Sequence, residues 1–168
     1  KTFSLGFNTY YTLLDNYITR EGDGTTIMYD GELGNVVKNV NKDKAFVTGY
    51  TASYQGRINQ NWRTSGFITY TKGRTFDTDE PMSSIPPLFG RFEISYRKNK
   101  VELSANYRFN AKKDITTYNI TEGIDNHVQT PIVNSSATND VEKYYGTPSW
   151  FTVGLNGKYS VNQNFSIQ

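Results

Sequence analysis

The chain has 168 residues, a formal net charge of +2 and no cysteine. The near-neutral charge argues against a nucleic-acid-binding protein, and the lack of cysteine excludes a disulfide scaffold and a cysteine-based zinc site. Aromatic residues make up 15% of the chain, although the mean hydropathy is only −0.64. Since no apolar run approaches the roughly 20 residues of a membrane helix, this composition favours membrane strands in which every second residue meets lipid.

Apolar residues alternate with polar ones along most of the chain, which predicts about seven strands. The expected strands cover residues 3–13, 45–54, 62–70, 91–96, 101–109 and 151–159, and a last one begins at residue 165. Residues 101–109 show the pattern most clearly. One face carries Val101, Leu103, Ala105, Tyr107 and Phe109, and the other carries Glu102, Ser104, Asn106 and Arg108. In residues 62–70 the pattern is ambiguous, because Phe67 lies opposite Trp62, Ile68 and Tyr70.

Long and short connections alternate between these strands. Short turns are expected at residues 56–61, 98–100 and 161–163, and long loops at residues 15–43, 76–87 and 111–147. Outer-membrane barrels are built in this way, with tight periplasmic turns and long extracellular loops. The pattern therefore places Trp62 at the periplasmic interface and Trp150 at the outer one, where indole rings are favoured.

The fold class that follows is an all-β, antiparallel segment of a transmembrane β-barrel. Bacterial single-chain barrels have an even number of strands, and open strand edges are not tolerated in lipid. We therefore expect further strands before Lys1 and after Gln168.

Four segments resemble a known family when they are taken in order. They are residues 69–74 (TYTKGR), 79–91 (DEPMSSIPPLFGR), 147–153 (TPSWFTV) and 159–167 (YSVNQNFSI). Together they resemble the C-terminal barrel of TonB-dependent outer-membrane receptors. One departure is Thr51, which follows Ala45, Val47 and Gly49 at a place where the family often has an acidic residue.

The resemblance implies that residues 1–168 are strands 15 to 21 of a 22-stranded barrel. It also implies a plug domain, a TonB box and a closing strand that lie outside these residues. The expected function is TonB-dependent uptake of a scarce nutrient, most simply an iron–siderophore complex or haem, across the bacterial outer membrane. The expected partners are outer-membrane lipid, the TonB complex through the N-terminal part, and the iron chelate.

Aromatic residues and one histidine in the long loops are the candidate ligand contacts: Tyr29, Tyr118, His127, Tyr144 and Tyr145. Aromatic rings offer flat contact area to a siderophore or haem, and a loop histidine is a possible metal ligand. The alternative for the tyrosines is loop packing or interface anchoring, and a lone histidine more often remains solvated.

Charged residues on the polar sides of two expected strands are candidates for the barrel lumen: Arg91, Glu93, Glu102 and Arg108. We expect them to pair across strands or to contact the plug rather than substrate. Asp77, Asp79 and Glu80 form an acidic cluster that suits calcium but is more simply a solvated loop. The sequence has no nucleophile motif, phosphate loop or zinc pattern, so we expect neither a cofactor, a metal site nor an enzymatic activity.

Two other fold and function classes remain open at this point. One is a small outer-membrane barrel or adhesin that is complete in itself, which would have an even number of strands and an aromatic C-terminus. The other is a soluble β-sandwich that binds carbohydrate. The sandwich requires Leu103, Tyr107 and Val153 to be buried against a second sheet.

Overall fold

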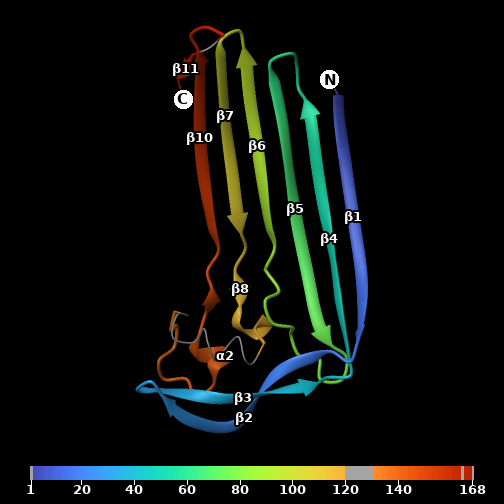
Figure 1. Ribbon diagram of the computed structural model, residues 1–168, viewed down its shortest axis with the longest axis vertical. Coiled ribbons are helices and arrows are strands. Elements are labelled where there is room, and N and C mark those ends of the chain that lie inside the picture. The colour runs from blue at the N-terminus through green and yellow to red at the C-terminus, as the bar shows by residue number, and fades with distance from the viewer. Residues whose placement is uncertain (1, 120–130, 164, 168) are drawn as a thin grey trace.

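The computed structural model describes residues 2–119, 131–163 and 165–167. Within them the main element is a seven-stranded sheet in the order β1-β4-β5-β6-β7-β10-β11, and each neighbouring pair is antiparallel. Figure 1 shows its long strands side by side. The strands are β1 (Thr2–Asp15), β4 (Lys44–Arg57), β5 (Trp62–Thr75), β6 (Phe89–Lys98), β7 (Val101–Asn110), β10 (Trp150–Ser160) and β11 (Ser166–Ile167). The predicted antiparallel all-β fold is confirmed.

The register of the sheet collects the alternating side chains onto two faces. Leu5 lies opposite Tyr54, Tyr54 opposite Gly66, and Gly66 opposite Phe92. The same face continues through Tyr107 and Val153 on β7 and β10. We call this the apolar face. The other side, which we call the polar face, carries mainly serine, threonine, asparagine, arginine and glutamate side chains.

Aromatic rings contact each other from strand to strand across the apolar face. Tyr54 and Phe92 have ring centroids 6.2 Å apart, Phe92 and Tyr107 6.4 Å, and Tyr107 and Phe151 5.7 Å. No second sheet covers these rings within the described residues. Leu103 is 51% exposed and Val153 63% exposed, so the burial that the β-sandwich alternative requires is not found. A face of this size and composition needs an apolar surrounding rather than water.

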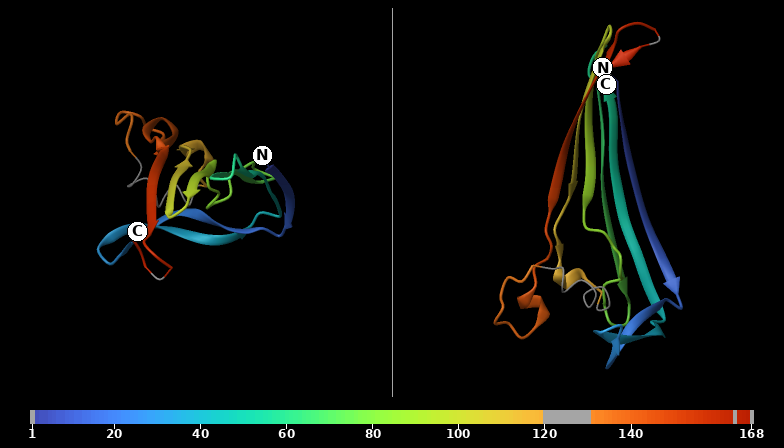
Figure 2. Two further views of the ribbon diagram at one scale, coloured as in Figure 1. Left: turned by 90° about the horizontal axis from the view of Figure 1, so that it is seen from above. Right: turned by 60° about the vertical axis from the view of Figure 1, so that its left-hand side comes forward.

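The two ends of the sheet differ, as the connection lengths predict. The short turns lie at one end, where both termini are also found, and the long loops lie at the other (Figures 1 and 2). The sheet does not close on itself in the described residues, because β1 and β11 are its two edges. A small barrel complete in itself would instead have its first and last strands paired.

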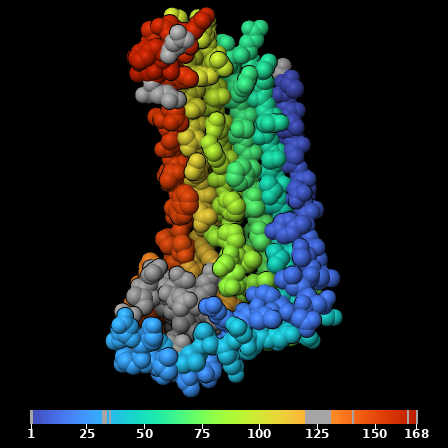
Figure 3. Space-filling model, in the orientation of Figure 1, coloured from blue at the N-terminus to red at the C-terminus, as the bar shows by residue number. Residues whose placement is uncertain are grey.

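The loop between β1 and β4 contains a hairpin that the sequence patterns did not predict. Strand β2 (Ile18–Tyr29) pairs with β3 (Glu32–Asn41), with a register shift between Gly22 and Thr26. The turn residues Asp30 and Gly31 both have positive φ, which suits the tight turn of a two-residue hairpin. Figure 3 shows the hairpin, coloured blue to cyan, running across the loop end of the molecule.

The loop between β7 and β10 is also structured in its described parts. It contains β8 (Lys113–Asp114), the 3₁₀ turn η1 (Ile115–Thr117), the one-turn helix α2 (Asp140–Lys143) and β9 (Gly146–Thr147), with β8 paired to β9. No helix among the described residues is long and apolar enough to span a membrane.

Several aromatic residues depart from the simple division of faces, and Phe67 and Trp150 are two of them. Phe67 lies opposite Arg91 on the polar face, where its ring meets Phe89 edge to face with centroids 6.2 Å apart. Trp150 lies opposite Asn110 and is therefore also on the polar face, whereas Trp62 is on the apolar face against Tyr96. Trp150 begins β10 at the end nearest the long loops, which agrees with its predicted position along the strand, while the register adds that it lies on the polar face.

Candidate functional site

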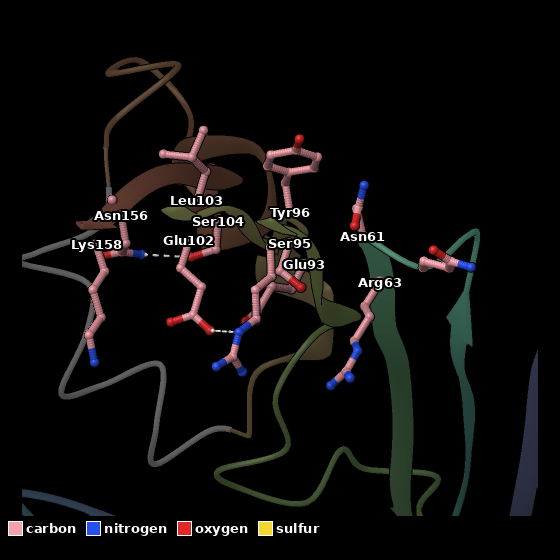
Figure 4. A pocket seen from close by; sticks show the side chains of 13 residues that line it. Asn61, Arg63, Glu93, Ser95, Tyr96, Glu102, Leu103, Ser104, Asn156 and Lys158 are labelled. Carbon is pink, nitrogen blue, oxygen red and sulfur yellow. Dashed lines mark hydrogen bonds and ion pairs between the residues drawn. The ribbon is translucent and has the colours of Figure 1, made fainter. Parts of the chain in front are cut away.

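Three open hollows lie along the polar face toward the short-turn end. Their volumes are about 320, 370 and 710 Å³. Strands β1, β4 to β7 and β10 supply most of the lining, and Glu93 borders all three hollows. In Figure 4 the side chains of Arg63, Glu102 and Lys158 extend to one side of the sheet, while Leu103 and Tyr96 extend to the other. We call the three hollows together the polar trough.

Charged side chains form two ion pairs in this trough. Arg91 binds Glu93 two residues along the same strand, with 2.7 Å between Nη2 and Oε2. Arg97 on β6 binds Glu102 on β7, with 3.2 Å between Nε and Oε1. Both pairs are partly open to water, so their main effect is to fix side-chain positions rather than to add much stability.

All four charged residues that the sequence proposed for the lumen lie on the polar face. Arg91 lies directly opposite Arg108, and Glu93 lies directly opposite Asn106. One expected cross-strand carboxylate pairing is present, between Glu102 and Arg97. Arg108 has no carboxylate within ion-pair distance among the described residues.

Most of the buried side chains in the described residues gather at the loop end, where they tie the long loops together. They are Ala45, Thr75, Met82, Lys113, Ile115, Tyr118 and Asn119. The Asn119 amide donates to the carbonyl oxygen of Pro81 at 2.9 Å, and the Met82 amide donates to the carbonyl oxygen of Gly73 at 3.0 Å. The loops after β5 and β7 are thus packed against one another. We call this set of residues the loop platform.

Of the candidate ligand residues, only Tyr118 belongs to the loop platform. Tyr118 is only 9% exposed, its hydroxyl is hydrogen-bonded to Thr147, and Lys113 lies over its ring. Its contacts favour the packing role that the sequence left open. Tyr145 is 37% exposed and lies under the Lys112 ammonium at 4.1 Å from the ring centroid, and Tyr144 is half-buried beside Lys143. Tyr145 therefore presents more surface to a ligand than Tyr118 does.

Of the remaining two candidates, only Tyr29 has a described position. Tyr29 ends β2 at the tip of the hairpin and is 77% exposed, beside the exposed Met28 and Ile27. His127 lies outside the described residues. The structure therefore brings Tyr118, Tyr144 and Tyr145 into one loop and places Tyr29 on another.

The acidic cluster at residues 77–80 is divided among separate partners. Asp79 binds Arg74 at 2.9 Å, Glu80 binds Lys42 at 3.2 Å, and Asp77 accepts a hydrogen bond from the amide of Thr78. Among the described residues no three His, Cys, Asp or Glu side chains are grouped so that they could hold a metal ion. Two of these carboxylates therefore hold the loop through ion pairs, and the third forms a local turn contact.

Lys42 joins two of the long loops, a contact that the sequence patterns missed. Its ammonium binds Glu21 on the hairpin and Glu80 on the loop after β5, and only 11% of the side chain is exposed. The hydrogen bond to Glu21, supported by Glu80, raises the pKa of Lys42 above its ordinary value. The hydrogen bond from Lys112 similarly holds the pKa of Asp114 below its ordinary value. No local sequence signal marks Lys42, because its two partners lie 21 and 38 positions away in the chain.

Comparison with known proteins agrees with this geometry. The family model described as TonB dependent receptor-like, beta-barrel matches residues 1–168, whereas no curated protein matches the sequence significantly. A solved structure named "Copper transporter OprC" is similar with a TM-score of 0.64 and 18% identity, over 97% of this chain and 21% of that chain. The chain thus spans about a fifth of that structure, and the likeness shows the fold alone. The match over its whole length shows that the chain belongs to the TonB-dependent receptor β-barrel family.

Proposed function

We propose that the receptor containing this chain lies in the bacterial outer membrane and imports a scarce nutrient, an iron–siderophore complex or haem, with energy supplied through TonB. The observation that carries the proposal is the separation of two faces on one open sheet. An apolar face with a ladder of aromatic rings suits lipid, and a hollowed polar face suits a wet lumen. Family membership supplies the link to TonB.

The exposed parts of the long loops, outside the loop platform, give this function a place for ligand capture. Lys112 and the exposed ring of Tyr145 together offer a cation and a flat apolar surface. Aromatic surface with a few convergent polar groups is typical of sites for small organic ligands. Tyr29 offers a second exposed ring on the hairpin, which also lies at the loop end of the sheet.

Radiolabelled iron uptake by cells that express the full-length receptor tests this function. Ferric siderophores and haem are supplied as separate iron sources, with and without an active TonB system. We expect uptake of one of these sources that depends on TonB, and a several-fold weaker uptake at limiting ligand in Y145A and Y29A. Y17F, at a half-buried tyrosine near the base of the hairpin, is the control and should retain uptake.

Two results would overturn the proposal in different ways. If cells with the receptor take up no more iron than cells without it, the proposed ligand class is wrong. If uptake persists without TonB, the proposed energy source is wrong. Copper supplied as a simple salt is an informative third substrate, because the similar structure is named as a copper transporter.

A further inference from the structure

Arginine residues face one another across neighbouring strands at two places on the polar face. Arg57 on β4 is in register with Arg63 on β5, and Arg91 on β6 is in register with Arg108 on β7. Side chains in register on one face of a sheet have Cβ atoms about 4.5–5.5 Å apart, and like charges placed in this way destabilise the pairing. Two such pairs on one face call for a compensating charge.

The second pair is partly compensated within the sheet. Arg91 forms an ion pair with Glu93, with 2.7 Å between Nη2 and Oε2. Arg108 is therefore the cation of this pair that has no carboxylate partner among the described residues. The first pair is not compensated in this way. Among the described residues no carboxylate lies within 4.0 Å of the guanidinium of Arg57 or Arg63. Glu93 borders the same hollow as Arg63, but its Oε2 is bound to Arg91.

The polar face as a whole is strongly cationic. Its described strands carry six cationic side chains and only two carboxylates. They are Arg57, Arg63, Arg91, Arg97, Arg108 and Lys158 against Glu93 and Glu102. Since the chain as a whole has a net charge of only +2, the balancing acidic residues lie elsewhere, and the positive charge is concentrated on this face. A groove lined by one sign of charge raises the local concentration of ions of the opposite sign.

The hollow beside the first pair has the size and the donors for an oxygen-rich ligand. It measures about 710 Å³ and is bordered by Arg57, Arg63 and the hydroxyl side chains of Ser4, Ser65 and Ser95. Both arginines are exposed, and Figure 4 shows Arg63 extending away from the sheet on the same side as Glu102 and Lys158. Guanidinium groups bind carboxylate and phosphate oxygens in a two-pronged geometry, and hydroxyl groups add further donors.

We propose that Arg57 and Arg63 form an anion-binding site on the lumen wall for a ligand with several carboxylate or phosphate groups. The ligand neutralises the opposed guanidinium groups, and Ser65 and Ser95 donate to its remaining oxygens. The role of this site in transport rests on the proposed uptake function. The site lies near the short-turn end, and its positive charge favours a cargo that leaves the receptor as an anion rather than as a bare metal cation. For its geometry the site rests only on the register and the hollow.

Calorimetry on the purified full-length receptor tests the site with citrate and pyrophosphate as separate probes. We expect at least one of them to bind, and R57Q/R63Q to weaken that binding by about tenfold or more. K98Q is the matched control, because it removes one charge from the same end of the sheet at a position in register with the apolar-face residue Val101. It should change the affinity by less than about twofold. No binding by the native receptor, or an equal loss in K98Q, would overturn the proposal.

The unfolding temperature of R63E separates a free ligand from a carboxylate of the receptor's own chain. In buffer without citrate or pyrophosphate, R63E should raise the unfolding temperature, because it places opposite charges across the strand pair. The bound anion should stabilise the native receptor and not R63E. A lower unfolding temperature in R63E without added anion would overturn the proposal, since it would show that an internal carboxylate already neutralises the pair.

The site and the proposed function fail in different ways. Normal TonB-dependent iron uptake by a receptor that binds neither citrate nor pyrophosphate would overturn the site and leave the function standing. Anion binding that R57Q/R63Q removes, in a receptor that imports no iron complex, would support the site and overturn the function.

Discussion

Asn119 donates its side-chain amide to the carbonyl oxygen of Pro81 at 2.9 Å and so joins the loop after β7 to the loop after β5. Only 4% of Asn119 is exposed, and its neighbours in the platform include the buried Tyr118 and Ile115. The loops after β5 and β7 are therefore packed against one another and do not extend separately into solvent. If they capture a ligand, they present it with a surface that is largely formed in advance.

Replacing Asn119 with alanine should loosen the loop platform. The Pro81 carbonyl loses a buried donor, which costs about 1–3 kcal/mol of local stability. Hydrogen exchange in the full-length receptor should become faster in residues 113–119 and 81–85 and stay unchanged in β4 and β5. N39A on the exposed strand β3 is the control. Equal exchange rates in N119A and the native receptor would show that the hydrogen bond does not hold the loops together.

The hairpin should detach from the loop after β5 when Lys42 loses its charge. The pKa of Lys42 is raised by Glu21 and Glu80, so the tether is fully present below the ordinary lysine pKa of about 10.5 and is lost as the pH rises through the raised value. K42Q should produce the detached state at neutral pH. Spin labels at Lys38 and Asp77 report the change as a broader distance distribution.

A matched variant makes the Lys42 experiment specific. K44Q removes an exposed lysine at the start of β4 that has no ion pair among the described residues. Its distance distribution should match that of the native receptor. The account of the tether is wrong if K42Q and K44Q behave alike, or if the distribution in the native receptor stays narrow well above the raised pKa.

Gly66 leaves room for two aromatic rings on the apolar face, so Gly66→Ala should be destabilising. A Cβ atom there would contact the Phe92 ring and lie 2.8 Å from Tyr54 Cε1 and 2.9 Å from the Arg91 carbonyl oxygen. Overpacking of this kind costs about 1–3 kcal/mol. G157A on the same face is the control, because its Cβ would meet only Leu103 at an ordinary 3.4 Å. It should change stability by less than about 0.5 kcal/mol.

Denaturant unfolding of the refolded full-length receptor in detergent measures both glycine variants. A lower midpoint for G66A than for G157A supports the close contact between rings and backbone. If the two midpoints agree, Tyr54 and Phe92 can move aside at little cost, and the strand-to-strand contacts of the rings do not fix their positions.

The sequence predicted the sheet well because alternation has a period of two and directly reports which side chains share a face. Residues 101–109 fell on the two faces as expected, and so did Arg91, Glu93, Glu102 and Arg108. The ambiguity at Phe67 was real, since its ring packs on Phe89 on the polar face. The loop-length pattern correctly separated the two ends of the sheet.

The loops were predicted less well for a physical reason. The β2–β3 hairpin contains polar residues on both sides and has a register shift, so it has no clean alternation to detect. The burial of Tyr118 depends in part on Thr147, which is 29 positions away in the sequence. The opposed arginines likewise become visible only when the register places Arg57 against Arg63.

Site-specific labelling of the full-length receptor in its membrane tests the division of the two faces most directly. Single cysteines replace Leu103, Tyr107 and Leu155 on the apolar face, and Ser104, Asn106 and Asn156 on the polar face. A probe attached to the first set should be quenched by brominated lipid chains, and the second set should react with a small water-soluble maleimide and show no such quenching. Quenching that does not alternate between neighbouring positions, or that appears at Ser104 and not at Leu103, would contradict a sheet that forms the wall of a membrane barrel.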